Sequence, residues 1–166
     1  MNLRAFLTAL VLLPCCALAQ QPPQPAPEVL FKTALADLSG QPATLERLHG
    51  QPLIVNFWAR WCGPCQTEIP DIVAEYPRAQ KTGVQVLGIA LDTKPDAVRD
   101  FAKAYDMDYP VLLVKDNGPE LLKQLGNPKA GLPYTLVIGR DGKVVTQKLG
   151  AMSRAEVVSA IEAAAK

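Results

Sequence analysis

This chain lacks several features that would point to a particular class of partner. Neither sign of charge dominates, because 17 Lys and Arg residues stand against 16 Asp and Glu residues, scattered along the sequence. No basic patch therefore predicts binding to nucleic acid or to anionic lipid. No apolar run reaches the roughly 20 residues that span a bilayer, and no internal repeat is present. A length of 166 residues predicts one globular domain.

The first nineteen residues, MNLRAFLTALVLLPCCALA, are typical of a secretory signal peptide. One cation precedes a short apolar run, and small residues end that run at Ala19. We therefore expect residues 1–19 to be cleaved and the protein to be exported to the periplasm. Lipidation at Cys15 or Cys16 is the alternative, but the residue before either cysteine is not the Gly, Ala or Ser that such signals normally carry.

Cleavage would leave two of the four cysteines, Cys62 and Cys65. In an oxidising compartment such a pair either rests as a disulfide or is kept reduced by a dedicated electron supply. A structural zinc site needs four ligands, and the remaining chain adds only His49. A permanent staple is disfavoured because so small a loop barely restricts the unfolded chain. We expect a redox-active disulfide with no metal and no external cofactor, and a two-thiolate Cu(I) site stays open.

The rest of the chain predicts a mixed α/β domain. Residues 20–28, QQPPQPAPE, indicate an extended Pro-rich spacer, and the domain occupies residues 29–166. Apolar runs predict buried strands over 52–58, 84–91 and 109–114, and helical patterns predict helices over 63–77, 92–105 and 118–126. Turn signals predict an edge hairpin turning at Ser39-Gly40 and a second hairpin turning at Asp141-Gly142. A C-terminal helix capped by Ser153 and Glu156 follows. In the first of these helices Pro70 is expected to cause a kink and Pro77 to end it. Such an order predicts a mixed central β-sheet flanked by helices.

The cysteine pair lies where a buried strand ends and a helix begins. The first turn of a helix has unpaired N–H groups and the positive end of the helix dipole, so a thiolate at Cys62 is favoured there. Cys65 lies one turn later and deeper in the fold. We expect Cys62 to be the exposed thiol that forms a mixed disulfide and Cys65 to be the buried thiol that resolves it.

Two segments of the sequence resemble one known family. VNFWARWCGPCQTEIP, residues 55–70, resembles the active-site segment of the thioredoxin superfamily, in its exported TlpA/ResA-like branch of thiol:disulfide oxidoreductases. GLPYTLVIGRDGKVV, residues 131–145, is similar to the later segment of the same family, in which a cis-proline faces the cysteines. The resemblance implies a thioredoxin-like fold with an N-terminal β-hairpin and a helical insertion between Leu91 and Leu125.

The resemblance also implies roles for individual residues. It makes Cys62 the nucleophile, Cys65 the resolving thiol and Pro133 the cis-proline, and the backbone of Leu132 would then pair with an extended substrate segment. These assignments predict a substrate groove beside the cysteines.

One position departs from thioredoxin itself, which carries a buried aspartate where this chain has Asn56. The TlpA/ResA-like branch instead uses a glutamate three residues after the second cysteine, which is Glu68 here. The spacing puts both on one helix face, so the carboxylate can take a proton from the resolving thiol. A solvated helix acid is the alternative. We expect Trp61 either to border the substrate site or to pack in the core, Trp58 to be a core residue and His49 to lie in a loop.

The spacer Gly63-Pro64 offers no charge or imidazole to stabilise the thiolate further. This favours a potential nearer to about −270 mV than to the about −120 mV of strong oxidants, and hence a reductant. A membrane electron donor would then be needed. By resemblance, the substrates are disulfides of apocytochrome c or of copper-site assembly proteins, and we expect a monomer. The alternatives are a Cu(I) carrier and a thiol peroxidase, although no Pro-x-x-x-Thr-x-x-Cys pattern precedes either cysteine.

Overall fold

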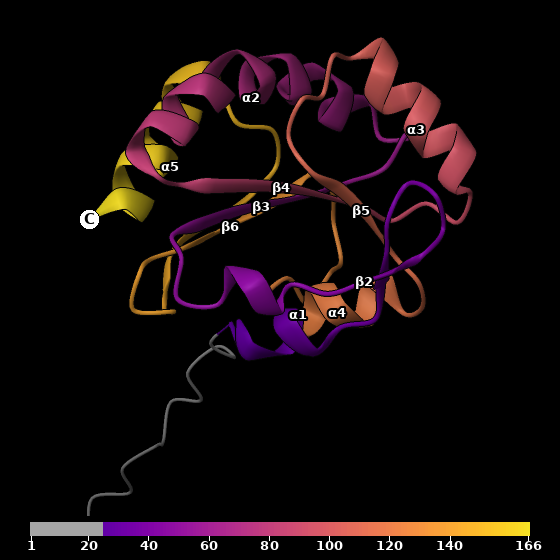
Figure 1. Ribbon diagram of the computed structural model, residues 1–166, viewed down its shortest axis with the longest axis horizontal. Helices are drawn as coiled ribbons and strands as arrows, with labels where there is room; N and C mark the ends of the chain where they lie inside the picture. Colours follow the sequence, from indigo (N-terminus) through magenta and orange to yellow (C-terminus); the bar gives the residue numbers. More distant parts are fainter. Residues whose placement is uncertain (1–24) are drawn as a thin grey trace, which may run out of the picture.

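The computed structural model describes residues 25–166, which form a mixed sheet covered by helices on both faces (Figure 1). The predicted signal peptide, with Cys15 and Cys16, and the first part of the predicted spacer lie outside the described residues. The elements are α1 (Glu28–Lys32), β1 (Leu35–Ala36), β2 (Pro42–Ala43), the 3-10 turn η1 (Glu46–Leu48), β3 (Leu53–Trp58), α2 (Gly63–Thr82), β4 (Gln85–Ala90), α3 (Pro95–Ala104), β5 (Val111–Val114), α4 (Gly118–Gln124), β6 (Tyr134–Ile138), β7 (Val144–Leu149) and α5 (Arg154–Ala165).

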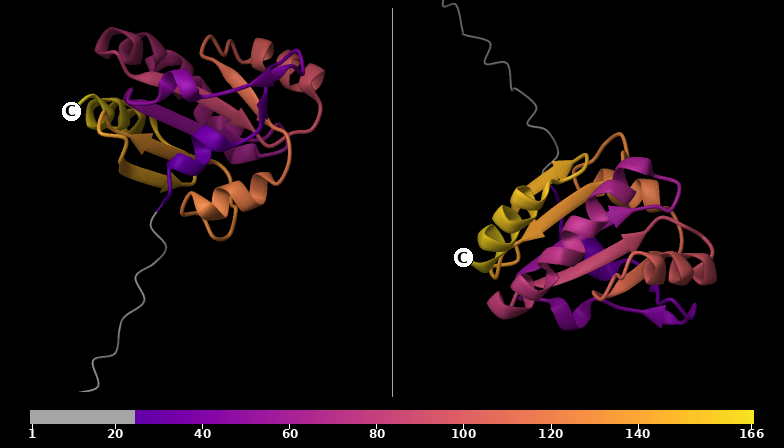
Figure 2. Two further views of the ribbon diagram at one scale, coloured as in Figure 1. Left: turned by 60° about the horizontal axis from the view of Figure 1, so that its bottom comes forward. Right: turned by 90° about the horizontal axis from the view of Figure 1, so that it is seen from above.

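The sheet has seven strands in the order β2-β1-β5-β4-β3-β6-β7. Strands β3, β4 and β5 run parallel, whereas β6, β7 and the β1–β2 hairpin pair antiparallel. Helices α2, α3 and α5 cover one face, and α1 and α4 cover the other (Figures 1 and 2). The mixed α/β fold with an N-terminal hairpin is therefore confirmed, and α3 and α4 lie within the interval expected for the helical insertion.

Strand β3 forms the centre of both cores, because all six of its residues are buried. Ile54 and Trp58 pack beneath α2 and α5, whereas Leu53, Val55 and Phe57 face the opposite layer. A strand covered on both faces needs a continuous apolar run rather than an alternating one. Trp58 is fully buried, which confirms the expectation that it is a core residue.

Helix α2 is longer than expected, because Pro77 does not end it. The helix continues through both Pro70 and Pro77 to Thr82, and Gly83 then takes a left-handed conformation with φ 75°. An internal proline costs roughly 3 kcal/mol, but each fully buried Ile side chain on this helix contributes about 1.5–3 kcal/mol. Ile69 and Ile72 are both buried, so packing outweighs the local preference.

The N-terminal boundary also differs slightly from the expected one. The backbone N–H of Ala26 donates to the carbonyl of Gln124 at 3.3 Å, and α1 begins at Glu28. The last residues of the predicted spacer therefore already contact the folded unit. Within residues 25–166, no helix combines the length and apolar character that crossing a membrane requires.

Candidate active site

The two cysteines form a disulfide at the start of α2, immediately after the end of β3. Cys62 is the N-cap of the helix, and its Sγ accepts a hydrogen bond from the backbone N–H of Cys65 at 3.2 Å. Pro64 lies in the first turn, where a missing N–H is tolerated. Cys62 is 6% exposed and Cys65 is fully buried, so the expected order of accessibility holds, although Cys62 is less exposed than expected.

The turn that leads into Cys62 is fixed by Asp92, which follows β4. The carboxylate of Asp92 accepts the backbone N–H of Arg60 at 2.9 Å and forms an ion pair with Arg60 Nε at 3.2 Å. Asp92 is only 6% exposed. The Arg60 charge is therefore compensated before it can act on the thiolate. Sequence reasoning missed this contact, since nothing in the pattern joins positions 32 residues apart.

A cis peptide bond joins Leu132 and Pro133 at the entry to β6, as expected. In the sheet, Phe57 pairs with Tyr134, so Pro133 lies at the same end of the sheet as the turn that carries Cys62. The carbonyl of Pro133 accepts the N–H of Gly150 at 2.9 Å, which ties this loop to the end of β7.

Asn127 fixes the chain just before the cis bond. Its Nδ2 donates to the carbonyl of Gly131 at 2.8 Å, and its Oδ1 accepts the N–H of Gly131 at 3.2 Å. Between them, Ala130 has a positive φ of 48°, an uncommon conformation for a residue with a Cβ. Asn127 is 2% exposed and was not among the residues expected from the sequence. An asparagine after a helix reads locally as a turn residue, so only the tertiary structure shows its role.

Glu68 is fully buried, so the alternative of a solvated helix acid is wrong. Its Oε1 accepts a hydrogen bond from Asn56 Nδ2 at 2.6 Å, and its Oε2 accepts the backbone N–H of Met152 at 2.9 Å. Burial raises the pKa of the Glu68 carboxyl, and the hydrogen bonds from Met152 and Asn56, with the charge of Lys148, oppose that rise. A carboxyl held in this way keeps its proton to a higher pH than a solvated one does, which favours proton exchange with a thiol.

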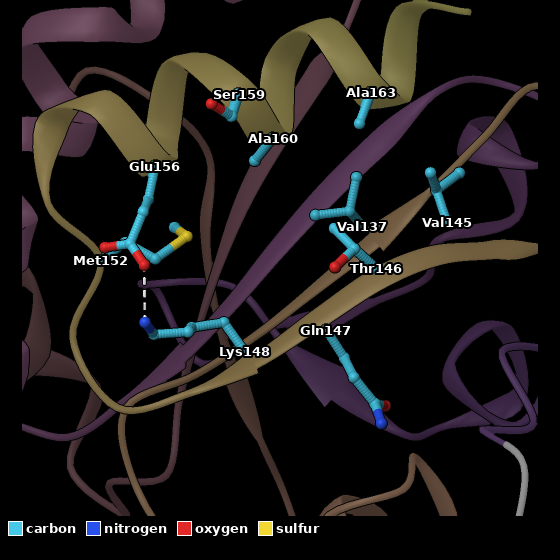
Figure 3. A pocket seen from close by; sticks show the side chains of 10 residues that line it. All are labelled: Val137, Val145, Thr146, Gln147, Lys148, Met152, Glu156, Ser159, Ala160 and Ala163. Carbon is cyan, nitrogen blue, oxygen red and sulfur yellow. Dashed lines mark hydrogen bonds and ion pairs between the residues drawn. The ribbon is translucent and has the colours of Figure 1, made fainter.

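Met152 also borders a shallow groove of about 360 Å³ between α5 and β7 (Figure 3). Beside it, Lys148 Nζ and Glu156 Oε1 form an ion pair at 2.6 Å, drawn as the dashed line. Glu156 further accepts hydrogen bonds from the backbone and side chain of Ser153, which is the expected capping box. Glu156 therefore partly neutralises the charge of Lys148, and Lys148 lowers the pKa of Glu68 less than an unpaired lysine would.

Trp61, the residue before Cys62, and Leu132, the residue before Pro133, border a second groove of about 270 Å³. Trp61 is 71% exposed, so of the two expectations for this residue the core packing one is wrong. The groove continues past Asp92 and Pro119, along the ends of the parallel strands. A surface tryptophan beside a reactive disulfide is well suited to contact a protein substrate.

The remaining candidates do not join the site. His49 follows η1 and its ring lies 4.1 Å from that of Phe31, which confirms a loop position remote from the disulfide. Across residues 25–166 no group of three or more His, Cys, Asp or Glu side chains is placed to hold a metal ion.

A thioredoxin-like sheet that presents a Cys-x-x-Cys disulfide at a helix N-terminus, beside a cis-proline, defines a thiol:disulfide oxidoreductase. The chain belongs to the AhpC/TSA family, whose model matches residues 22–147.

Named relatives agree with that class. Thiol-disulfide oxidoreductase ResA of Bacillus thuringiensis subsp. konkukian is 32% identical over 123 residues, which cover 74% of this chain and 69% of that protein. A thiol:disulfide interchange protein of the thioredoxin family from Chlorobium tepidum has a TM-score of 0.69 and 29% identity, covering 89% of this chain and all of its own. A secreted Mycobacterium tuberculosis disulfide oxidoreductase homologous to E. coli DsbE has a TM-score of 0.68 and 26% identity, over 83% of this chain and 99% of its own.

Proposed function

We propose that this thiol:disulfide oxidoreductase is an exported reductant of protein disulfides. The observation that carries the proposal is the neutral surroundings of Cys62. The spacer Gly63-Pro64 is uncharged, the first turn of α2 holds no acid, and Arg60 is paired with Asp92. With only a helix N-terminus to stabilise it, the thiolate is moderately favoured, as in reductants rather than in strong oxidants.

The reaction begins from the reduced dithiol. The Cys62 thiolate attacks one sulfur of a substrate disulfide, which forms a mixed disulfide and releases the other substrate sulfur as a thiolate. The Cys65 thiolate then attacks Cys62 Sγ, which restores the internal disulfide and releases the second substrate thiolate. Two electrons pass from the protein to the substrate. A membrane dithiol donor returns two electrons and two protons to regenerate the reduced form.

Glu68 is proposed to accept the proton that Cys65 loses in the second step. Its burial three residues after Cys65 on the same helix supports this role, because a carboxylate there has no competing solvent. The raised pKa of Glu68, caused first by burial, brings its proton affinity closer to that of a thiol.

The substrates are proposed to be disulfides of apocytochrome c before haem attachment or of copper-site assembly proteins. The groove bordered by Trp61 and Leu132 supports a protein substrate, because Trp61 directly precedes Cys62 in the chain and its large aromatic side chain is exposed. A periplasmic location, with residues 1–19 as the export signal, is consistent with the secreted relative from Mycobacterium tuberculosis. We propose that the protein acts as a monomer.

The test removes the resolving thiol. Cys65→Ala keeps the nucleophile but cannot break the mixed disulfide, so covalent adducts should accumulate when the full chain is expressed in its exported compartment. Mass spectrometry of the reducible adducts should identify cytochrome-maturation or copper-assembly proteins and a membrane donor. The matched control is Cys62→Ala, which should capture far less because Cys65 is fully buried.

Two other outcomes would overturn the proposal. If Cys65→Ala captures no partner while the wild type binds Cu(I) tightly and reduces insulin poorly, the protein is a copper carrier. If the wild type consumes peroxide at the expense of the dithiol and does not reduce protein disulfides, it is a thiol peroxidase.

A further inference from the structure

Asn56 is a fully buried polar residue at the centre of an otherwise apolar strand. It lies between Ile54 and Trp58 on the face of β3 that packs beneath α2 and α5. Burying an amide without partners costs several kcal/mol in an apolar setting, so a residue of this kind must be retained for the bonds that it makes.

Those bonds join three elements around one carboxylate. Asn56 Nδ2 donates to Glu68 Oε1 of α2 at 2.6 Å and to Thr135 Oγ1 of β6 at 3.0 Å. Thr135 is the cross-strand partner of Asn56 in the sheet and is fully buried as well. Since strand pairing fixes both residues, Asn56 approaches Glu68 from a rigid support.

We propose that Asn56 is the positioning residue of Glu68, and that it holds this side chain in both of its protonation states. This inference rests on the proposed function, in which Glu68 takes and returns a proton during each cycle. It assigns no contact with substrate to Asn56, which acts only through Glu68.

An amide is suited to this task because it carries a donor and an acceptor on one planar group. When Glu68 is ionised, Nδ2 donates to the carboxylate, as the structure has it. When Glu68 is protonated, a half-turn of the amide places Oδ1 where it accepts the carboxyl O–H. In residues 25–166 no side chain or backbone group donates to Oδ1, so the turn breaks only the two bonds that Nδ2 donates, and Oδ1 accepts two bonds from the same partners in exchange. The Thr135 hydroxyl then donates instead of accepting, since a hydroxyl can do either.

The other groups that face Glu68 cannot replace Asn56. Lys148 lies on β7 and is paired with Glu156 at the surface. The hydroxyl of Tyr109 is buried, and burial and the charge of Glu68 raise its pKa, so it stays neutral. The thiol of Cys65 is the proton donor in the reaction. The remaining hydrogen bond comes from the backbone N–H of Met152, which donates and cannot accept.

The test measures the pH profile of the dithiol in the full-length mature protein. Asn56→Ala removes one hydrogen bond to the carboxylate, so the profile of disulfide reduction should move to higher pH. The rate at neutral pH should fall by roughly tenfold, the low end of the effect of losing one bond to a charged group. Asn56→Asp places two carboxyl groups in contact, so they should share a proton and the profile should move further in the same direction.

Three controls separate positioning from loss of structure. Ile54→Val lies on the same strand face and loses a buried methylene but removes no hydrogen bond to Glu68, so it should lower stability and leave the profile in place. Thr135→Val should move the profile in the same direction as Asn56→Ala but less, and Thr135→Ser should restore it. In the Glu68→Gln background, Asn56→Ala should cause no additional shift.

The proposal is overturned if the Asn56→Ala profile coincides with those of the wild type and Ile54→Val, or if Asn56→Ala shifts the profile equally in the Glu68→Gln background. Failure of the underlying role is a separate result. If Glu68→Gln alone leaves the profile and the rate unchanged, Glu68 is not the proton acceptor and the proposed positioning has no function to serve. Capture of partners by Cys65→Ala depends on neither residue and tests the oxidoreductase assignment independently.

Discussion

Asn127 provides a direct test of how the loop before Pro133 is held. Asn127→Ala removes both side-chain hydrogen bonds to Gly131, at 2.8 and 3.2 Å, and leaves the carbonyl and N–H of Gly131 without these partners. Each hydrogen bond contributes about 0.5–1.5 kcal/mol net. Because the site is partly buried, water compensates incompletely, and we expect the free energy of unfolding to fall by about 2–3 kcal/mol.

The same change should slow catalysis, because Leu132 lines the same groove as Trp61, the residue before Cys62. Urea unfolding gives the loss of stability, and reduction of a protein disulfide below the unfolding midpoint gives the rate. Asn127→Asp is the matched variant, since it keeps an acceptor for the Gly131 N–H but sets a carboxylate oxygen against the Gly131 carbonyl, so its loss should be at least as large as that of Asn127→Ala. An Asn127→Ala protein with the stability and rate of the wild type would refute the inferred anchoring of the loop.

Three further predictions concern the site itself. The folded-state pKa of Glu68 is raised above 4.5, so ionisation of Glu68 weakens the fold. The stability of the wild type relative to Glu68→Gln should therefore be greatest below pH 4.5. That difference should decrease as the pH rises through the folded-state pKa of Glu68. Denaturation of both proteins from pH 4 to 8 checks the sign, and a difference independent of pH contradicts it. Trp61→Ala should raise the KM for protein substrates. Because the side chain is 71% exposed, the free energy of unfolding should change by no more than about 0.5 kcal/mol. An unchanged KM would show that Trp61 does not contact the substrate. Equilibration with glutathione should place the Cys62–Cys65 couple near about −270 mV, and a value near about −120 mV would instead make it a disulfide donor.

The parts of the fold that local patterns determine were predictable from the sequence. The apolar run of β3, the Asp141-Gly142 hairpin and the capping box at Ser153 each arise from neighbouring residues, and the structure contains all three. The end of α2 was not predictable in this way. Pro77 is a helix breaker by local preference, and only the burial of the helix against the sheet shows why the chain continues as a helix to Thr82.

The same distinction between local patterns and tertiary contacts applies to the residues of the candidate site. The cysteine pair and Pro133 lie in motifs that can be recognised from adjacent residues. Asp92 and Asn127 cannot, because each acts on a segment through a side chain whose partner is set by the tertiary fold. Spacing alone put Glu68 on the face of Cys65, but a spacing of three residues does not reveal whether that face is buried.

The difference from thioredoxin at position 56, an asparagine in place of an aspartate, follows from where the buried acid Glu68 lies. Asn56 Nδ2 lies 2.6 Å from Glu68 Oε1, so an aspartate at position 56 would bring two carboxyl groups into contact within an apolar core. Two like charges at that distance cannot both ionise, and one would remain protonated and unable to accept a proton. A chain that carries its buried carboxylate on α2 therefore needs a neutral residue at this point of β3. An amide satisfies that condition and also supplies the donor that the carboxylate requires.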